Sequence, residues 1–191
     1  MVADGDAWRD WLTAHHDTST GVWLVLAKKG TTGPTTLTYD PALEEALCQG
    51  WIDGQVGRRD DGTYRVRFTP RRARGLWSAR NVAIVSRLIE QNRMRLAGTA
   101  QVEAAKADGR WDAAYGSQGT IEVPADLNAA LDAAPAARAM FEILTRQNRY
   151  AVVYQVDTAR RADTRARRIE KFVGMLARGE TAYPQKRKLD S

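Results

Sequence analysis

Hydrophobic positions in the first part of the chain switch between helical and extended spacing. Tryptophan and leucine side chains recur at helical intervals over residues 7–16, behind an acidic start, which predicts a short amphipathic helix. Residues 21–27 form a nearly continuous apolar run, which is typical of a strand buried on both faces. After a turn rich in glycine, threonine and proline, residues 35–38 are expected to pair back as a second strand.

The next segment combines a helix with a β-hairpin. Asp40 followed by Pro41 predicts a helix start, and Gly50 is placed to end that helix before a strand that begins at Trp51. An Asp-Gly pair at residues 61–62 is a hairpin turn signal. In residues 64–68, apolar side chains alternate with arginines, so we expect the apolar ones to face the core and the arginines to face solvent.

Helices are predicted for most of the remaining chain. Ser78 is a candidate N-cap for a helix through residue 89, and we expect Gly98 to close that segment. A further helix should run over residues 100–108 and stop at Gly109. Periodic apolar positions then predict helical pieces over residues 126–133, 136–145 and 149–156, and a longer last helix whose apolar positions repeat over residues 162–176.

These elements predict an α+β fold. A small mixed or antiparallel sheet packed with helices is expected over residues 1–116, a turn-rich linker over 117–126, and a helical C-terminal segment over 127–179. Residues 180–191 are expected to form a mobile tail.

The amino-acid composition limits the kinds of chemical site that the chain can contain. The 191 residues include one cysteine, Cys48, and two adjacent histidines, which excludes an internal disulfide and gives no recognisable zinc site. Cys48 is interpreted as a small buried hydrophobe, and we expect neither a metal nor another cofactor. The acidic N-terminus lacks the features of a secretory signal, and no window is apolar enough for a membrane span, so a cytoplasmic protein is expected. The sequence leaves the oligomeric state open.

Charge is concentrated in one stretch of the chain. The net charge is +6, yet residues 58–95 alone carry eleven Lys and Arg against three Asp and Glu, an excess of +8. Such a field attracts anions, so an anionic small molecule, nucleic acid or lipid is a plausible partner. The alternative is a basic surface that is merely solvated.

Two motifs in this region carry candidate chemistry. GWIDG places Asp53 between glycines and beside an aromatic ring, where a carboxylate can act as a general base or simply anchor a loop. FTPRRARGLWS places Arg71, Arg72 and Arg74 before the predicted helix start at Ser78, a combination suited to carboxylate or phosphate. These arginines could instead pair with acids of residues 1–57, where the net charge is −5.

Six ordered motifs together resemble the YdeI/OmpD-associated family, often labelled bacteriocin-protection proteins. They are ALCQGWIDG, FTPRR, LWSARN, RM at residues 93–94, AKADGRWDAAY and DTRARRIEK, and they extend the resemblance from Trp8 to about Gly179. The resemblance implies an α+β lobe with an appended helical segment, and a link to protection against antimicrobial peptides or bacteriocins. Some descriptions of the family imply a periplasmic location, from which this sequence departs because it shows no signal peptide. Gln91-Asn92 also departs from the acid and glycine usual there. The resemblance supplies no catalytic residues.

The leading hypothesis is a non-enzymatic protein that binds an anionic or amphipathic small molecule or peptide. Tryptophans would form apolar walls and polar groups would fix orientation. The candidate ligand-binding residues are Trp51, Asp53, Arg71, Arg72, Trp77, Ser78 and Asn81. A second hypothesis is an enzyme with Asp53 as base and the arginine loop as oxyanion stabiliser. A third is a nucleic-acid-binding module built on the basic segments, although no recognised nucleic-acid motif is present.

Overall fold

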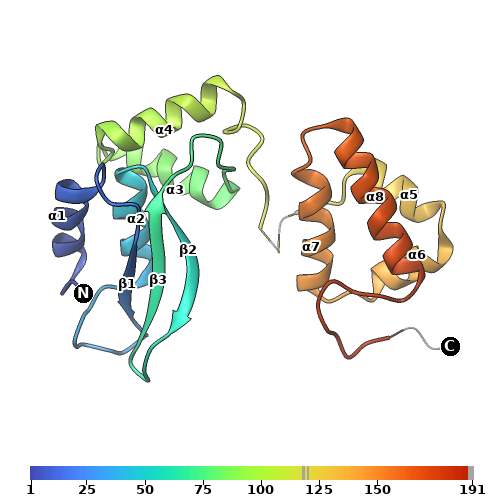
Figure 1. The fold of residues 1–191 in the computed structure, drawn as a ribbon, viewed down its shortest axis with the longest axis horizontal. Coiled ribbons are helices and arrows are strands. Elements are labelled where there is room, and N and C mark those ends of the chain that lie inside the picture. The colour runs from blue at the N-terminus through green and yellow to red at the C-terminus, as the bar shows by residue number, and fades with distance from the viewer. Residues whose placement is uncertain (118, 120, 189–191) are drawn as a thin grey trace. The chain divides into compact units, whose positions relative to one another are not determined.

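The structure, a computed structural model, describes residues 1–117, 119 and 121–188. It is an α+β protein whose helices and strands divide into two compact units. The first unit contains residues 1–77 and 81–114, and the second contains residues 78–80 and the chain from Tyr115 onward. The sheet and its covering helices lie in the first unit, and the C-terminal helices form the second (Figure 1). The predicted fold class is confirmed.

The sheet has three antiparallel strands in the order β1-β3-β2. They are β1 (Val22–Ala27), β2 (Trp51–Arg58) and β3 (Thr63–Pro70), and the β2-β3 hairpin turns at the predicted Asp-Gly pair. Leu24 lies opposite Val66, and Asp53 lies opposite Phe68. Cross-strand partners share a face of the sheet, so this register assigns the side chains of β2 that accompany Phe68 to the core face.

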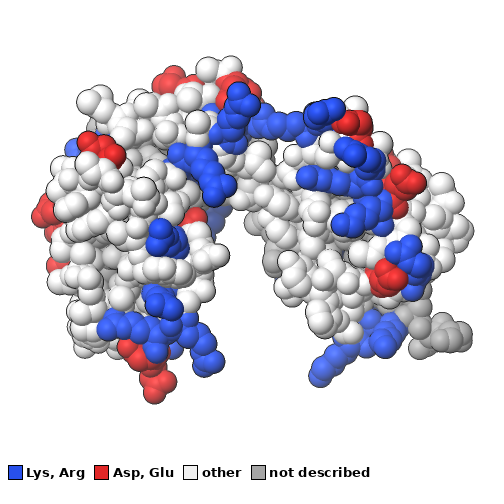
Figure 2. All heavy atoms as spheres, viewed as in Figure 1, with Lys and Arg blue, Asp and Glu red and all other residues white. Residues whose placement is uncertain are grey.

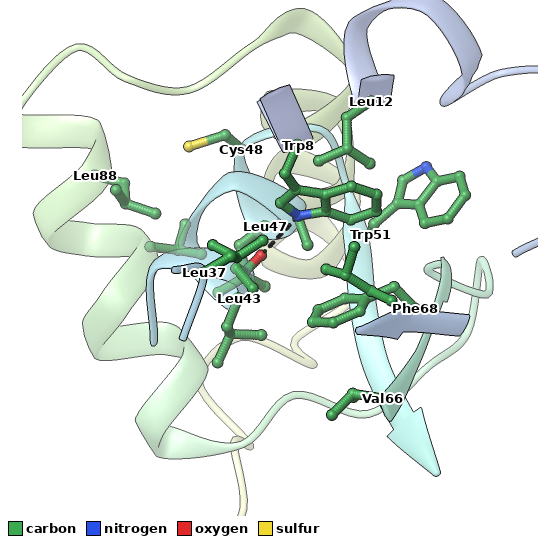
Figure 3. Close-up of a cluster of buried hydrophobic side chains, with 14 of the residues drawn as sticks. Trp8, Leu12, Leu37, Leu43, Leu47, Cys48, Trp51, Val66, Phe68 and Leu88 are labelled. Atoms are coloured by element: carbon green, nitrogen blue, oxygen red, sulfur yellow. Dashed lines mark hydrogen bonds between the residues drawn. The ribbon is translucent and has the colours of Figure 1, made fainter. Parts of the chain in front are cut away.

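Helices α1 (Gly5–His15) and α2 (Tyr39–Cys48) supply apolar side chains to the core face of the sheet. Trp8 lies at the centre of this core, with its ring centroid 5.6 Å from that of Phe68, and its indole Nε1 donates a hydrogen bond to the Ala42 carbonyl at 3.1 Å (Figure 3). The bond satisfies the one polar atom of a side chain that is otherwise apolar. Trp51 and Leu12 complete the same cluster.

Two predictions about strands are wrong. β1 is not buried on both faces: Leu24 and Leu26 face the core, whereas Trp23 on the other face remains 39% exposed. Residues 35–38 are not a strand. Within the described part of the chain, one backbone bond joins this segment to β1: the Leu37 carbonyl accepts from the Ala27 amide at 2.8 Å. Thr38 is already the N-cap of α2. The helix therefore begins two residues earlier than predicted, with Thr38 in place of Asp40 as the N-cap.

Helices α3 (Ala79–Glu90) and α4 (Leu96–Ala107) follow the sheet. The prediction that Gly98 closes the first of them is wrong, because α3 ends eight residues earlier and Gly98 lies inside α4. Gly98 is buried against the end of α2. Its lack of a side chain serves helix packing, and the stop at Gly109 is confirmed by a turn with φ of +75°.

The second unit contains α5 (Ala125–Asp132), α6 (Pro135–Glu142), α7 (Arg146–Asp157) and α8 (Ala162–Ala177), close to the predicted helical pieces. Its core is separate from that of the first unit and consists of Leu127, Leu131, Ala137, Met140, Phe141, Val152, Val153, Val156, Phe172 and Leu176. Beyond α8, Tyr183 and Gln185 form hydrogen bonds with the start of α7.

Candidate functional site

The first two predicted site residues, Trp51 and Asp53, are held by contacts on the core face of the sheet. Trp51 is 1% exposed, and its indole Nε1 donates to the His16 carbonyl at 3.1 Å. The Asp53 carboxylate accepts a hydrogen bond of 2.7 Å from the hydroxyl of Tyr39 in α2. The structure thus gives Trp51 a packing role and ties Asp53 to a helix.

Arg71 and Trp77 are brought together at the two ends of the predicted arginine loop. The Arg71 guanidinium carbon lies 3.7 Å from the centroid of the Trp77 ring, a cation–π arrangement. Its Nη1 donates to the carbonyl of Leu76 at 3.3 Å. Arg71 is only 8% exposed and Trp77 only 2% exposed, so this contact is almost entirely removed from water.

A second buried guanidinium, Arg110, holds the same loop. Its Nη1 donates to the Gly75 carbonyl at 3.0 Å, the residue next to the carbonyl held by Arg71. Its Nε donates to both carboxylate oxygens of Asp108 at 2.7 Å. Arg110 is 2% exposed, and the following Trp111 lies with its ring centroid 5.0 Å from that of Trp77. We call Arg71, Trp77, Arg110 and Trp111 the arginine–tryptophan cluster.

Two hydrogen-bond donors of this cluster have no acceptor among the described residues. They are the indole Nε1 of Trp77 and the Nη2 of Arg110, both buried. Leaving a buried donor unsatisfied costs roughly 1–3 kcal/mol, and more when the donor is charged. Buried donors without an acceptor are rare in folded proteins, and an unseen bound group is one common explanation for them.

The remaining predicted site residues lie apart from these contacts. Arg72 and Arg74 are exposed, and neither forms an ion pair within the described part of the chain. Ser78 is assigned to the second unit and forms a one-residue bridge with Tyr115, whose carbonyl accepts the amide of Ala79. The backbone amide of Ala79, the first residue of α3, therefore already donates a hydrogen bond within the protein. Asn81 is 9% exposed in the first turn of α3.

The acids of α2 pair with other arginines of the first unit. Glu45, whose side chain is 7% exposed, receives hydrogen bonds from Arg9 and Arg93 at 2.6–2.9 Å. Glu44 receives bonds from Arg93 and Arg87. Burial raises the pKa of Glu45, but the hydrogen bonds from Arg9 and Arg93 outweigh it and hold the pKa below its usual value. This network joins α1, α2 and the turn after α3.

Other chemical groups add little to the site. Burial raises the pKa of the Cys48 thiol to about 11, which is the opposite of an activated nucleophile. No group of three or more potential metal ligands was found in the described residues. Within those residues, no helix combines the length and apolar character needed to cross a bilayer.

Arg110 and Trp111 were absent from the predicted site. Their signal lay in the AKADGRWDAAY motif, where a basic and an aromatic residue directly follow Gly109. Sequence spacing alone does not show that two segments some 35 residues apart meet. The hydrogen bond from Arg110 to Gly75 establishes this.

Comparison with known proteins assigns the two parts of the chain to different family models. Residues 1–101, more than half of the chain, match a domain of unknown function (DUF8412). The chain belongs to this family. Residues 120–179 match the family described as bacteriocin-protection, YdeI or OmpD-associated, which confirms the suspected family for the helical segment. No curated protein and no solved structure matches the chain.

The two matches divide the motifs on which the resemblance was based. DTRARRIEK lies inside the YdeI/OmpD-associated match. ALCQGWIDG, FTPRR and LWSARN lie inside the DUF8412 match, and AKADGRWDAAY lies between the two. The arginine–tryptophan cluster is therefore built by the DUF8412 region and the segment that follows it.

Proposed function

We propose that the first unit binds the anionic group of an amphipathic small molecule at the arginine–tryptophan cluster. Guanidinium groups can bind a carboxylate or phosphate through two parallel hydrogen bonds. The half-buried ring of Trp111, which packs against Trp77, would provide apolar surface for the remainder of such a ligand. The proposal keeps Arg71 and Trp77 from the predicted site and adds Arg110.

The observation that supports this most is the pair of buried donors without acceptors, Trp77 Nε1 and Arg110 Nη2. An anion that reached both atoms would remove the cost of their burial, and the gain would contribute to its affinity.

The family model that matches residues 120–179 is described as bacteriocin-protection. Binding of such a ligand would give that description a physical meaning. A protein that captures an amphipathic toxic compound lowers its free concentration, and this capture is the role we propose in protection. The activity is binding without turnover, with neither metal nor cofactor.

Octanoate tests the proposal because it combines a carboxylate with an apolar chain. We expect octanoate to change tryptophan fluorescence saturably and to raise the melting temperature, because a ligand of the folded state stabilises it. Octanol, which has the same chain without the charge, should do neither. Equal effects of octanol and octanoate would contradict the proposal.

Variants of the cluster locate the binding. Trp77→Phe removes an unsatisfied donor while keeping a ring, and Arg110→Lys keeps the charge but loses the planar fork; both should weaken octanoate binding at least tenfold. The matched control is Arg72→Ala, an exposed arginine of the same loop, which should bind octanoate within about twofold of the unchanged chain. Circular dichroism would show that each variant is folded. Equal losses in Arg72→Ala and Arg110→Lys would assign binding to general charge.

A further inference from the structure

The second unit contains a pocket of about 370 Å³ with an aromatic and amide lining. Its lining residues are Gln147, Tyr150, Ala151, Tyr154, Gln155 and Tyr183. All but the last lie on one face of α7, at positions i, i+3, i+4, i+7 and i+8 counted from Gln147. Tyr183 comes from the segment after α8. We call this the tyrosine pocket.

Asn148 places Tyr183 in this pocket. Asn148 is 1% exposed, its Oδ1 accepts the Tyr183 amide at 2.8 Å, and its Nδ2 donates to the Tyr183 carbonyl at 3.0 Å. A buried side-chain amide is costly unless it is hydrogen-bonded, and here it binds both polar groups of one residue. The backbone of Tyr183 is thereby held while 47% of the residue stays exposed.

The other two tyrosines are ordered by their neighbours. The Tyr150 and Tyr154 rings stack with centroids 5.4 Å apart and 24° between planes, and Tyr115 contacts Tyr154 edge-on at 4.9 Å. Such preordered rings offer a planar ligand a stacking surface at little cost in side-chain entropy. Gln147 and Gln155 are exposed at the pocket and offer both donors and acceptors.

The surroundings of the tyrosine pocket are basic. Residues 143–156 and 181–188 contain five cations and no acid: Arg146, Arg149, Lys186, Arg187 and Lys188. Figure 2 shows Lys and Arg side chains gathered at the end of the second unit where the C-terminal segment passes the start of α7. This lining and these cations favour an occupant that combines a planar, hydrogen-bonding ring with negative charge.

We propose that the tyrosine pocket receives a base of single-stranded nucleic acid. The base would stack on the tyrosine rings, its edge would bond to the amides of Gln147 and Gln155, and neighbouring phosphates would contact the cations of residues 186–188. Stacking on aromatic side chains with a basic surface along the backbone is the general mode of single-strand binding. A duplex is excluded, since its bases are already stacked and paired. This site is separate from the arginine–tryptophan cluster.

Three probes of equal length test the proposal with the full chain: a 12-nucleotide oligo(dA) labelled with fluorescein, an abasic strand with the same phosphates, and a blunt duplex. Fluorescence anisotropy at 150 mM salt should show the tightest binding for oligo(dA). We expect the abasic strand to bind about five- to a hundredfold more weakly, the range that one stacked base contributes. Unlabelled adenosine monophosphate should compete only at far higher concentration, because it carries a single phosphate group.

Variants separate stacking from charge. Tyr183→Ala should weaken oligo(dA) binding about five- to a hundredfold and leave binding of the abasic strand unchanged. Tyr183→Phe, which keeps the ring, should bind oligo(dA) as the unchanged chain does. Replacing residues 186–188 by alanine should weaken both strands and reduce the salt dependence. Tyr64→Phe in the first unit is the matched control and should change nothing. Equal affinity for the abasic strand, the duplex or the mononucleotide, an unchanged Tyr183→Ala protein, or no binding at all would overturn the proposal.

Discussion

The carbonyl oxygen of Cys48 lies so close to the backbone of Gly98 that a β-carbon added at Gly98 would come within 2.2 Å of it. The same carbonyl accepts the amide of Arg95 at 3.0 Å. The end of α2 and the first turn of α4 therefore meet backbone to backbone, and neither side has a flexible group that could move away.

We predict that Gly98→Ala destabilises the protein by about 3 kcal/mol or more, because the helices must separate to admit one methyl group. Urea denaturation followed by tryptophan fluorescence would measure the change. Gly174→Ala is the matched control. It also lies inside a helix, but its β-carbon would meet only ordinary contact at 3.5 Å, so it should stabilise by roughly 0.5–1 kcal/mol. Similar results for both variants would contradict this interpretation.

Glu45→Gln should destabilise the first unit by about 2 kcal/mol at pH 7, since it removes the charge that pairs with Arg9 and Arg93. The pKa of Glu45 is lowered in the folded protein. Its contribution is thus complete above the unfolded pKa of about 4.3 and is lost as pH falls through the folded value. Urea melts at several pH values should show the two proteins converging as the pH falls from the unfolded pKa through the lower folded value. Asp6→Asn, an exposed partner of Arg9, should change stability little at any pH.

Cys48 should not react with thiol reagents while the first unit is folded. Burial is the main cause that raises its pKa to about 11, so at pH 8 only about one molecule in a thousand carries a thiolate. Dithionitrobenzoate should label one thiol per chain at once in 6 M guanidinium and only very slowly in buffer. Immediate labelling of the folded protein would show that the thiol is accessible.

Asn148→Ala should release the C-terminal segment from α7. The variant loses the bonds that hold Tyr183 and Gln185, and we expect a loss of about 2 kcal/mol in the second unit. Hydrogen exchange at the Tyr183 amide should become fast, while amides in the middle of α8 remain protected. Asn128→Ala, an exposed amide on α5, should leave exchange at Tyr183 unchanged. Continued protection of Tyr183 in Asn148→Ala would show that other contacts hold the segment.

The pattern of residues along the chain correctly predicted the elements that depend mainly on interactions between sequence neighbours. The Asp-Gly turn between β2 and β3 and the long periodic run of α8 follow directly from turn chemistry and helical spacing. The pattern failed at residues 35–38, which were predicted as a strand but form an irregular segment that leads into α2. It failed again at Gly98, because a glycine that ends a helix and one that lets two helices touch look the same in a sequence.

The candidate site was partly visible before the structure. The arginine loop pointed to Arg71 and Trp77, and the structure places the two side chains in contact. Trp51 is a core residue because its strand position faces α1, and that depends on register rather than composition. Arg110 required a contact between distant segments, which no local pattern encodes.

By itself, the sequence determined the α+β composition, the hairpin, the separate helical segment and the excess of positive charge at residues 58–95. These properties follow from side-chain periodicity and charge, which act over a few neighbouring residues. The tertiary structure decided which charges are neutralised, as in the Glu45 network, and which donors are buried without an acceptor, as at Trp77 and Arg110. Burial and pairing depend on what folds against a residue, and only the packed chain defines that.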